Sequence, residues 1–318
     1  MEADGSTNSK MSTGMITTEN ISKHYNDVIA VSELSLNVRK GEIYGFLGLN
    51  GAGKTTTIRM LLGLIHPTSG SAYIKGERIS HNNNRLWREV GSLVELPCSY
   101  PELTVNENLE VFRRLHFIDD RNSVDRIINK LQLRPYTNKR AKDLSMGNNQ
   151  RLGLAKALIH EPEILILDEP SNGLDPAGIY EIREMLLDLA VNKDVTIFIS
   201  SHILGEISRF ATRIGIIHQG KLMEEFNANQ LELICKKKLR VAAHDLERAR
   251  LILTDKGFTV TKNTENILEI IDDDPICHPD QIATLLVNSG CPPTLLEVAE
   301  EDLESYFLRA IGLKGGIK

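Results

Sequence analysis

The sequence predicts an α/β protein whose first part contains a mainly parallel β-sheet and whose last part is a small α+β domain. The first observation is the alternation, from Ile16 to about Asn227, of helical patterns with short apolar runs: ELSLNV, EIYGFLG, VGSLVE, EILILDE, VTIFIS and RIGIIH. Several runs are apolar throughout, which is typical of parallel strands that are buried on both faces. The second observation is a change of pattern after Asn227, where the polar connector NANQLELICKKK precedes shorter elements.

On this basis the chain divides into three parts. Residues 1–15 are polar, and we expect a flexible extension without the apolar region of a signal peptide. Residues 16–227 form the larger domain, because strand and helix patterns alternate there without interruption. Residues 228–318 have the pattern strand, helix, two strands, helix, strand and a closing helix. This order predicts a ferredoxin-like layer of helices on a sheet.

The composition excludes several classes of protein. The chain has 318 residues, of which 41% are hydrophobic and 25% are charged, and its formal net charge is −6. A mildly acidic chain has no global electrostatic attraction to DNA or RNA, so we expect no nucleic-acid partner. No apolar run approaches the roughly 18–20 residues of a membrane-spanning helix. The four cysteines are scattered without a C-x-x-C pair, which indicates reduced thiols in a cytosolic protein.

The strongest motif is EIYGFLGLNGAGKTTTIRMLLGL, in which an apolar strand ends at a glycine-rich turn that opens an amphipathic helix. Its centre, Gly48–Thr55, fits G-x-x-x-x-G-K-[ST] in the strand, loop and helix context that this pattern requires. Glycines let backbone N–H groups turn toward phosphate oxygens, and the helix N-terminus adds a partial positive charge. A purely structural glycine turn is the alternative, but it needs neither the lysine nor the threonine. The predicted nucleotide-binding residues are Gly48, Asn50, Gly51, Ala52, Gly53, Lys54, Thr55 and Thr56.

Within this loop Lys54 is expected to reach the β- and γ-phosphates, and the Thr55 hydroxyl is expected to bind Mg²⁺. A second motif, EILILDEPSNGLDP, ends an apolar strand with two carboxylates. Asp168 is the expected partner of the metal. Glu169 can turn toward the γ-phosphate and act as the general base on the attacking water, although a helix-capping acidic pair is the alternative. His202 follows the apolar run VTIFIS and could donate a hydrogen bond to a γ-phosphate oxygen.

The phrase KDLSMGNNQRLGLAKALIHEPEILILDEPSNGLDP resembles the signature motif and Walker B segment of ABC-transporter ATPase domains. With the phosphate loop, a D-loop containing Asp175 and the switch histidine His202, the resemblance covers about residues 16–220. It implies a P-loop ABC ATPase domain with a mainly parallel sheet core, an antiparallel β subdomain and a helical subdomain at about residues 96–160. It also implies ATP and Mg²⁺ as cofactors, and it identifies Tyr25 as the aromatic residue that stacks on adenine.

The signature of this chain, Leu144-Ser145-Met146-Gly147-Asn148, departs from the family's usual LSGGQ. Ser145 and Gly147 keep a hydroxyl and free backbone N–H groups at the N-terminus of a helix that we expect to begin near Asn149. The side-chain contribution of Met146 and Asn148 stays open. The resemblance implies a homodimer in which each ATP lies between the Walker residues of one subunit and the signature residues, Ser145 to Asn148, of the other.

Three functions are open at this point. The first is the ATPase subunit of an exporter, attached to the cytoplasmic face of the membrane through separate integral membrane permease subunits. The second is a ribosome-associated ATPase of the translation type, which would resemble two fused ATPase units, whereas this chain has one. The third is a DNA-repair or condensing ATPase, which would contain long coiled coils, whereas this chain has no heptad run. These differences favour the exporter.

Within the transporters, the chain resembles the ATP-binding subunits of bacitracin-type and lantibiotic self-immunity exporters. The resemblance rests on IYGFLGLNGAGKTTTIRMLLGLIHPTSG, GSLVELPCSYPELTVNENL, LSMGNNQRLGLAKAL and the C-terminal EEDLESYFLRAIG. It implies that the subunit powers the export or removal of peptide or lipid-directed antibiotics. The exported compound does not follow from it, because the permease makes the substrate contacts.

The stretch VGSLVELPCSYPELTVNENL places one carboxylate, Glu95, just after an apolar strand. In ABC ATPases a glutamine stands there, and its loop links the γ-phosphate and Mg²⁺ to the permease. A glutamate would instead meet the carboxylates of the EILILDE motif, and two carboxylates about 4 Å apart repel by on the order of 4 kcal/mol at an effective dielectric of about 20. We therefore expect Glu95 to act as a metal-binding and catalytic residue only when Mg–ATP is present. Residues 96–109 are the expected permease contact, with Tyr100 and Leu103 as anchors.

Overall fold

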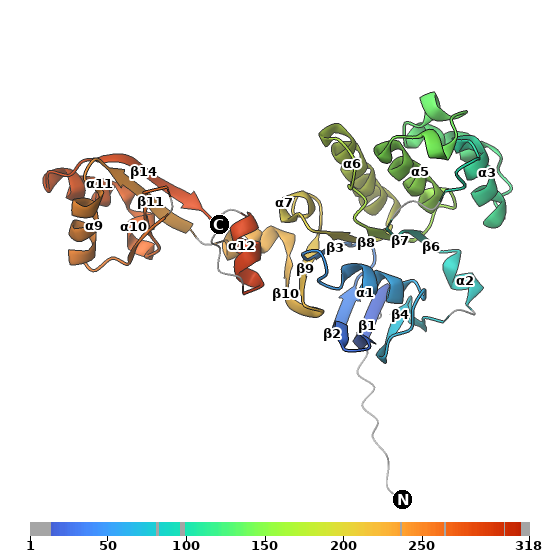
Figure 1. The fold of residues 1–318 in the computed structure, drawn as a ribbon, viewed down its shortest axis with the longest axis horizontal. Coiled ribbons are helices and arrows are strands. Elements are labelled where there is room, and N and C mark those ends of the chain that lie inside the picture. Colours follow the sequence, from blue (N-terminus) through green and yellow to red (C-terminus); the bar gives the residue numbers. More distant parts are fainter. Residues whose placement is uncertain are drawn as a thin grey trace, which may run out of the picture. The chain divides into compact units, whose positions relative to one another are not determined.

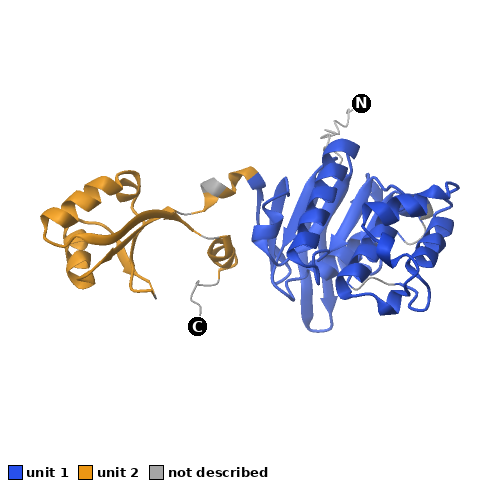
Figure 2. Cartoon of the chain, turned by 90° about the horizontal axis from the view of Figure 1, so that it is seen from above, with its two compact units in different colours: residues 1–228 blue, residues 229–318 orange. Residues whose placement is uncertain are grey.

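The computed structural model describes residues 14–80, 83–95, 99–235, 237–263, 265–301 and 303–312. The chain divides into two compact units, residues 1–228 and residues 229–318 (Figure 2). Each unit has an apolar core of its own. Among the described residues, no helix is both long enough and apolar enough to cross a membrane.

The first unit is built on a six-stranded sheet with the strand order β10-β9-β3-β8-β7-β6. Its strands are β3 (Ile43–Leu47), β6 (Val90–Leu93), β7 (Ile164–Asp168), β8 (Thr196–Ser201), β9 (Arg213–His218) and β10 (Lys221–Asn227). All neighbouring strands pair in parallel except β9 and β10, which pair antiparallel. Every residue of β3, β7 and β8 is buried, as predicted from their apolar runs. The carboxyl ends of these central strands therefore meet at one edge of the sheet.

A second, antiparallel sheet has the order β2-β1-β4-β5. It consists of β1 (Ile16–Tyr25), β2 (Val28–Val38), β4 (Ser69–Ile74) and β5 (Glu77–Arg78). Its inner face shares one core with the six-stranded sheet and with Ile58 of α1 (Lys54–Leu61). At the centre of this core Phe46 and Phe198 lie with their ring centroids 5.2 Å apart. This sheet is the predicted antiparallel β subdomain.

Helices cover both faces of the six-stranded sheet (Figure 1). α1 lies on the side of the antiparallel sheet, and α5 and α6 lie on the opposite side. Beside α1, the helices of the unit are α2 (Asn84–Trp87), α3 (Val105–Leu115), α4 (Asn122–Lys130), α5 (Met146–Leu158), α6 (Pro176–Lys193) and α7 (Leu204–Ile207), with 3-10 turns at Arg134–Tyr136 and Ala141–Asp143. The expected start of α5 near Asn149 is wrong, because the Ser145 side chain caps the helix and α5 begins at Met146.

The second unit is a small α+β structure. Its elements are the 3-10 turn Ala228–Gln230, which straddles the boundary, and α8 (Leu231–Ile234), β11 (Lys237–Ala243), α9 (Leu246–Asp255), β12 (Val260–Lys262), β13 (Leu268–Ile270), α10 (Asp273–Cys277), α11 (Pro279–Asn288), β14 (Pro293–Glu300) and α12 (Leu303–Ala310). The sheet has the order β12-β13-β11-β14, and all its neighbours are antiparallel. Two β-α-β segments are thereby interleaved, which is the split βαβ arrangement of ferredoxin-like layers. Leu239, Val241 and Leu268 of the sheet pack against Leu253 and Leu286 of the helices.

Candidate active site

The glycine-rich loop between β3 and α1 has the backbone that a phosphate cradle requires. Gly51 and Gly53 have positive φ angles of 81° and 108°. Two features exclude a side chain at Gly53. Its φ lies in the region that favours glycine, and a Cβ there would lie 2.5 Å from the carbonyl oxygen of Ala30. Lys54 is 6% exposed, and its Nζ donates to the carbonyl oxygen of Gly48 at 2.6 Å. The loop therefore holds the lysine over its own backbone, at the N-terminus of α1.

Two strands and one helix bring a small oxygen cluster together beside this loop. The Thr55 hydroxyl of α1 donates to Oδ2 of Asp168 at 2.8 Å. The Ser200 hydroxyl of β8 donates to Oδ1 of the same carboxylate at 2.6 Å. Asp168 is 3% exposed, so its carboxylate is fixed from both sides. Mg²⁺ prefers hard oxygen ligands, and the Thr55 and Asp168 oxygens fit that preference.

Glu169 turns away from the strand direction immediately after Asp168. Its φ of 49° lies in the left-handed region, which is costly for a residue with a side chain. Its backbone N–H donates to the Ser200 hydroxyl at 3.0 Å, and this bond stabilises the turn. As a result Oε1 lies 3.1 Å from Nζ of Lys54, and Oε2 lies 2.7 Å from Nδ1 of His202. The expected general base thus lies between the lysine of the glycine-rich loop and the histidine.

Two residues of this centre were not singled out from the sequence. Ser200 contacts both carboxylate residues, and it belongs to the polar pair that ends the apolar run VTIFIS. Gln150 is 3% exposed, and its Nε2 donates to the carbonyl oxygen of Pro170 at 3.1 Å. Gln150 therefore links α5 to the segment that follows Glu169. Ser200 had a sequence signal, because it is a polar residue at the end of an apolar run, whereas Gln150 had none, because it lies between the polar residues Asn149 and Arg151.

The signature and the D-loop each begin a helix. Ser145 caps α5, where its hydroxyl accepts from the N–H of Asn148 at 3.3 Å. Asp175 caps α6, where its Oδ1 accepts from the N–H of Gly178 at 3.0 Å. The side chain of Met146 lies against the D-loop, since a Cβ added to Gly173 would be 2.6 Å from its Cγ. The methionine that replaces the usual glycine therefore packs on the neighbouring motif.

Tyr25 and Glu95 were also predicted as site residues, and among the described residues neither forms a hydrogen bond or ion pair with Asp168 or Glu169. Tyr25 ends β1 and is 44% exposed, with Nζ of Lys23 5.1 Å from its ring centroid. Glu95 follows β6 by two residues and has a positive φ of 55°. Its carboxylate forms an ion pair with Arg59 of α1, a residue that the sequence did not single out. The expected anchors Tyr100 and Leu103 are exposed and half-buried respectively, whereas residues 96–98 of the same loop lie outside the described residues.

A buried asparagine organises the described part of that loop. Asn108 of α3 is fully buried, and its Oδ1 accepts from the N–H of Tyr100 at 2.8 Å. Its Nδ2 donates to the carbonyl oxygens of Tyr100, Leu103 and Thr104 at 3.0–3.1 Å. Thr104 and Glu107 form a capping box at the start of the same helix. The exposed Tyr100 is therefore presented by a rigid turn.

Taken together, the glycine-rich loop, the Thr55–Asp168 pair and the positioned Glu169 define a P-loop nucleoside-triphosphatase. Comparison with known proteins narrows this class. Residues 31–172 match the family model described as ABC transporter. The bacitracin transport ATP-binding protein BcrA of Bacillus licheniformis is 42% identical over 94% of this chain and 97% of its own length. The lantibiotic transport ATP-binding protein SrtF of Streptococcus pyogenes is 37% identical over 66% of this chain and 90% of its own length.

Solved structures agree with this assignment. The ATP-binding subunit of an ABC transporter matches with a TM-score of 0.63 and 26% identity, covering 69% of this chain and 92% of that one. A dimeric bacterial ABC transporter cassette matches with a TM-score of 0.63 and 25% identity, covering 67% of this chain and 99% of that one. The chain belongs to the ABC transporter family of ATP-binding proteins and is an ATPase. The predicted P-loop ABC ATPase fold and the expected ATP ligand are confirmed.

Proposed function

We propose that this chain is the ATP-hydrolysing subunit of an exporter that removes peptide or lipid-directed antibiotics through separate permease subunits. The single observation that carries hydrolysis is the carboxylate of Glu169, positioned between Lys54 and His202. The substrate class is supported by the relatives named for bacitracin and lantibiotic transport. Both names describe transport, so the translation-type and DNA-associated alternatives gain no support from them.

The geometry supports a direct hydrolysis mechanism. Backbone N–H groups of the phosphate loop and Lys54 bind the β- and γ-phosphates. The carboxylate of Glu169 accepts the proton of the attacking water as the water oxygen bonds to the γ-phosphorus and ADP leaves. His202 donates a hydrogen bond to a γ-phosphate oxygen. Mg²⁺, which Thr55 and Asp168 would hold, supplies charge neutralisation for the phosphates when it is bound.

The signature completes the site from a second copy of the chain. In this proposal the helix N-terminus capped by Ser145 faces the γ-phosphate bound to the partner, where its N–H groups and partial positive charge stabilise the anion. A side chain at Gly147 would crowd the D-loop, because a Cβ there would lie 3.1 Å from the carbonyl oxygen of Gly173. Met146 links the signature to the D-loop through its packing on Gly173, so the two motifs approach the partner together. Asp175 fixes the D-loop by capping α6.

Glu95 would change partners when Mg–ATP binds. Its ion pair with Arg59 is between side chains that are 54% and 39% exposed, and exposed ion pairs contribute only about 0–1 kcal/mol. Such a contact exchanges readily for a divalent cation. The pair also neutralises the carboxylate in the meantime, which removes its repulsion toward Asp168 and Glu169. Glu95 therefore has a partner in both states: Arg59 without Mg–ATP, and the metal ion when Mg–ATP is bound.

The permease would dock beside this glutamate. A hollow of about 510 Å³, here named the permease groove, is lined by Leu62, Leu64, Trp87, Val90, Ser92, Leu93, Val94, Phe112, His116, Gly153, Lys156, Ala157 and His160. Large apolar side chains are exposed in the same segments, including Leu64 at 59% and Leu115 at 60%. Exposed apolar side chains around a hollow are typical of an interaction surface. An amphipathic cytosolic helix of a permease fits such a groove, and it would attach the chain to the cytoplasmic face of the membrane.

A charge-neutral substitution of the base tests this function. Glu169→Gln keeps the shape of the side chain but cannot accept the proton, so the purified protein should bind ATP normally and lose ATP hydrolysis. It should also accumulate as an ATP-bound dimer in size-exclusion chromatography. In cells that lack the native gene, wild-type protein should restore growth in bacitracin or a lantibiotic, and Glu169→Gln should not.

Three outcomes separate the parts of the proposal. Normal ATP hydrolysis by Glu169→Gln contradicts the role of Glu169 as base. Hydrolysis that depends on Glu169, without any effect of the gene on antibiotic resistance, contradicts the substrate class and leaves the ATPase mechanism intact. Glu181→Gln is a matched control, because this glutamate lies on the flank of α6 in an ion pair with Arg151. The control should retain both hydrolysis and resistance.

A further inference from the structure

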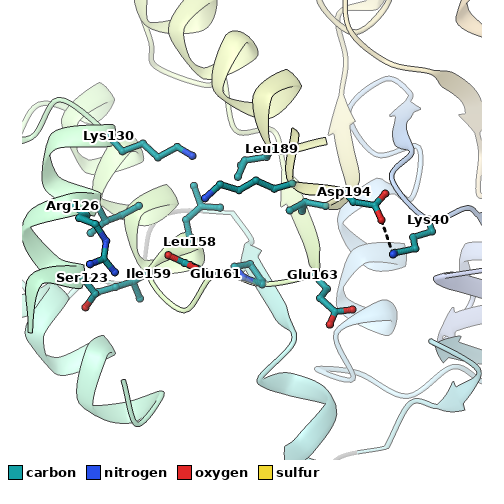
Figure 3. Close-up of a pocket in the computed structure, with 14 residues that line it drawn as sticks. Lys40, Ser123, Arg126, Lys130, Leu158, Ile159, Glu161, Glu163, Leu189 and Asp194 are labelled. Atoms are coloured by element: carbon teal, nitrogen blue, oxygen red, sulfur yellow. Dashed lines mark ion pairs between the residues drawn. The ribbon is translucent and has the colours of Figure 1, made fainter. Parts of the chain in front are cut away.

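A cavity of about 540 Å³ (Figure 3) is lined by residues at the amino ends of β7 and β8, and these ends form the edge of the six-stranded sheet opposite the active site. Its walls are α4, the C-terminal ends of α5 and α6, and the residues that precede β7 and β8. Glu163 and Val195 mark those strand starts, whereas Asp168 ends β7 in the active site. At about 3.3 Å per residue the two edges are about 15 Å apart. We name this hollow the amino-edge cavity, and its size is within the range of about 300–1,000 Å³ of small-molecule sites.

The floor of the amino-edge cavity is apolar. Ile127 of α4, Leu158 and Ile159 at the end of α5, and Leu189 of α6 line it, and each of these residues is at most 6% exposed. These residues come from three helices, and Figure 3 shows Leu158, Ile159 and Leu189 beside the hollow. A ligand with a hydrocarbon body would therefore remove apolar surface from water on both sides of the contact.

Two lysines above this floor lack full neutralisation. Nζ of Lys130 has its nearest carboxylate, Asp188, at 3.9 Å, and among the described residues Lys193 has no ion-pair partner. Burial lowers the pKa of Lys130, and the positive charge of Lys193 lowers it further. By contrast Lys40 has a close partner in the same cavity, because its Nζ lies 2.5 Å from Asp194. An anion placed between Lys130 and Lys193 would remove their mutual repulsion.

The wall of the cavity also contains a buried hydroxyl and a carboxylate. Ser123 of α4 lines the cavity and is 4% exposed, and its Oγ has no hydrogen-bond partner among the described residues. A buried polar atom without a partner costs free energy, so this hydroxyl makes the cavity wall locally less stable than a fully paired wall. The cavity also contains one carboxylate, Glu161, without an ion-pair partner among the described residues. An unpaired carboxylate can attract a cationic ligand, so a matched cation has to be tested beside the anion.

We propose that the amino-edge cavity binds a small amphiphilic anion, with its carboxylate or phosphate head on Lys130 and Lys193 and its hydrocarbon body on the apolar floor. A fatty acid released from a membrane and a soluble organic acid share this chemistry. The cavity is distinct from the ATP site, yet it contacts the C-terminal ends of α5 and α6. α5 runs from the Ser145 cap to Leu158, and α6 runs from the Asp175 cap to Lys193. The occupant would therefore contact the helices that carry the signature and the D-loop.

Isothermal titration of the full chain with octanoate tests the proposal, and octylamine serves as the matched cation. We expect one octanoate site on the wild type, at least about tenfold weaker binding to Lys130→Met/Lys193→Met, and unchanged binding to the exposed control Lys256→Met. Glu161→Gln should bind octanoate more tightly, which keeps the test informative if the double variant does not fold. Saturating ATP should not displace octanoate, because the two sites are at opposite edges of the sheet.

Several results would overturn the proposal. Octylamine binding as tightly as octanoate would assign the cavity to cations or to apolar contact alone. Equal affinity of octanoate for the wild type and for a folded double variant would exclude the lysines. Competition between octanoate and ATP would place the ligand in the nucleotide site. Two further titrations separate the soluble from the lipid-derived ligand. If inorganic phosphate bound as tightly as octanoate, the apolar floor would have no role. An affinity that rises from butyrate to decanoate supports a lipid-derived occupant.

Discussion

The active site and the permease groove of the same unit differ in how completely their polar groups are paired. In the active site Asp168 and Glu169 each have two or more partners, and Ser200 joins them. In the permease groove the rings of His116 and His160 stack with centroids 3.9 Å apart, and Nδ1 of His160 is buried without a hydrogen-bond partner. A fully paired centre is held rigid before its substrate arrives, whereas the groove leaves one buried nitrogen without a hydrogen bond.

The largest expected effect comes from breaking the pairing of the active site at Ser200. Ser200→Ala removes the donor to Asp168 and the acceptor for the N–H of Glu169, so both carboxylates lose their orientation. We expect the rate of ATP hydrolysis to fall about a hundredfold, equivalent to about 2.7 kcal/mol of transition-state stabilisation, with ATP binding retained. Steady-state hydrolysis and a fluorescent ATP analogue measure the two quantities.

The neighbouring serine is the control for this prediction. The Ser201 hydroxyl accepts from the N–H of Ile203 at 3.0 Å, and among the described residues it forms no hydrogen bond with either carboxylate. Ser201→Ala should therefore retain hydrolysis within a few-fold. Equal losses in the two variants would mean that the effect is a general disturbance of β8, and the assigned role of Ser200 would be wrong.

The same contrast explains how much could be predicted from the sequence. The candidate active site is assembled from continuous motifs, so Lys54, Asp168 and Glu169 could be predicted as site residues from their own neighbours in the chain. The permease groove is assembled from five elements that are far apart in the sequence, and no local pattern joins His116 to His160. Arg59 was missed for the same reason, since an ion pair with Glu95 depends on the packing of α1 against the end of β6. Short-range motifs predict chemistry, whereas pairings between distant elements require the fold.

Acid should weaken the region of the permease groove. Burial lowers the pKa of His160 to about 4, with a smaller contribution from His116, so between about pH 6.5 and pH 4 the unfolded chain binds a proton that the folded chain excludes. The contribution of the neutral His160 to the free energy of unfolding is therefore fully present above pH 6.5, and it decreases as the pH falls through this window. From pH 7 to pH 5 we expect a loss of at most about 2 kcal/mol in the free energy of unfolding.

Trp87, the one tryptophan of the chain, lines the permease groove and reports on this unit by fluorescence during urea unfolding. His160→Gln cannot titrate, and its amide can still donate to the carbonyl oxygen of Val90, as the imidazole Nε2 can at 3.2 Å. This variant should lose most of the difference between pH 7 and pH 5. His278→Gln, at an exposed histidine of the other unit, should keep the full difference. An undiminished pH effect in His160→Gln would show that another group carries it.

The smallest effect is expected at the junction of the two regions, where Arg59 holds Glu95. Arg59→Met removes the ion pair but keeps the aliphatic stem, and an exposed pair of this kind stabilises the fold by less than about 1 kcal/mol. The free carboxylate should then engage Mg–ATP more easily. The Mg²⁺ concentration that gives half-maximal hydrolysis should fall by a factor of about 1.4 to 5, which is the same free energy expressed as a ratio. In a Glu95→Gln background Arg59→Met should leave that concentration unchanged, because the charge that Arg59 holds is absent. A shift of equal size in both backgrounds would mean that Arg59 acts on the phosphates directly and that Glu95 is not its partner in catalysis.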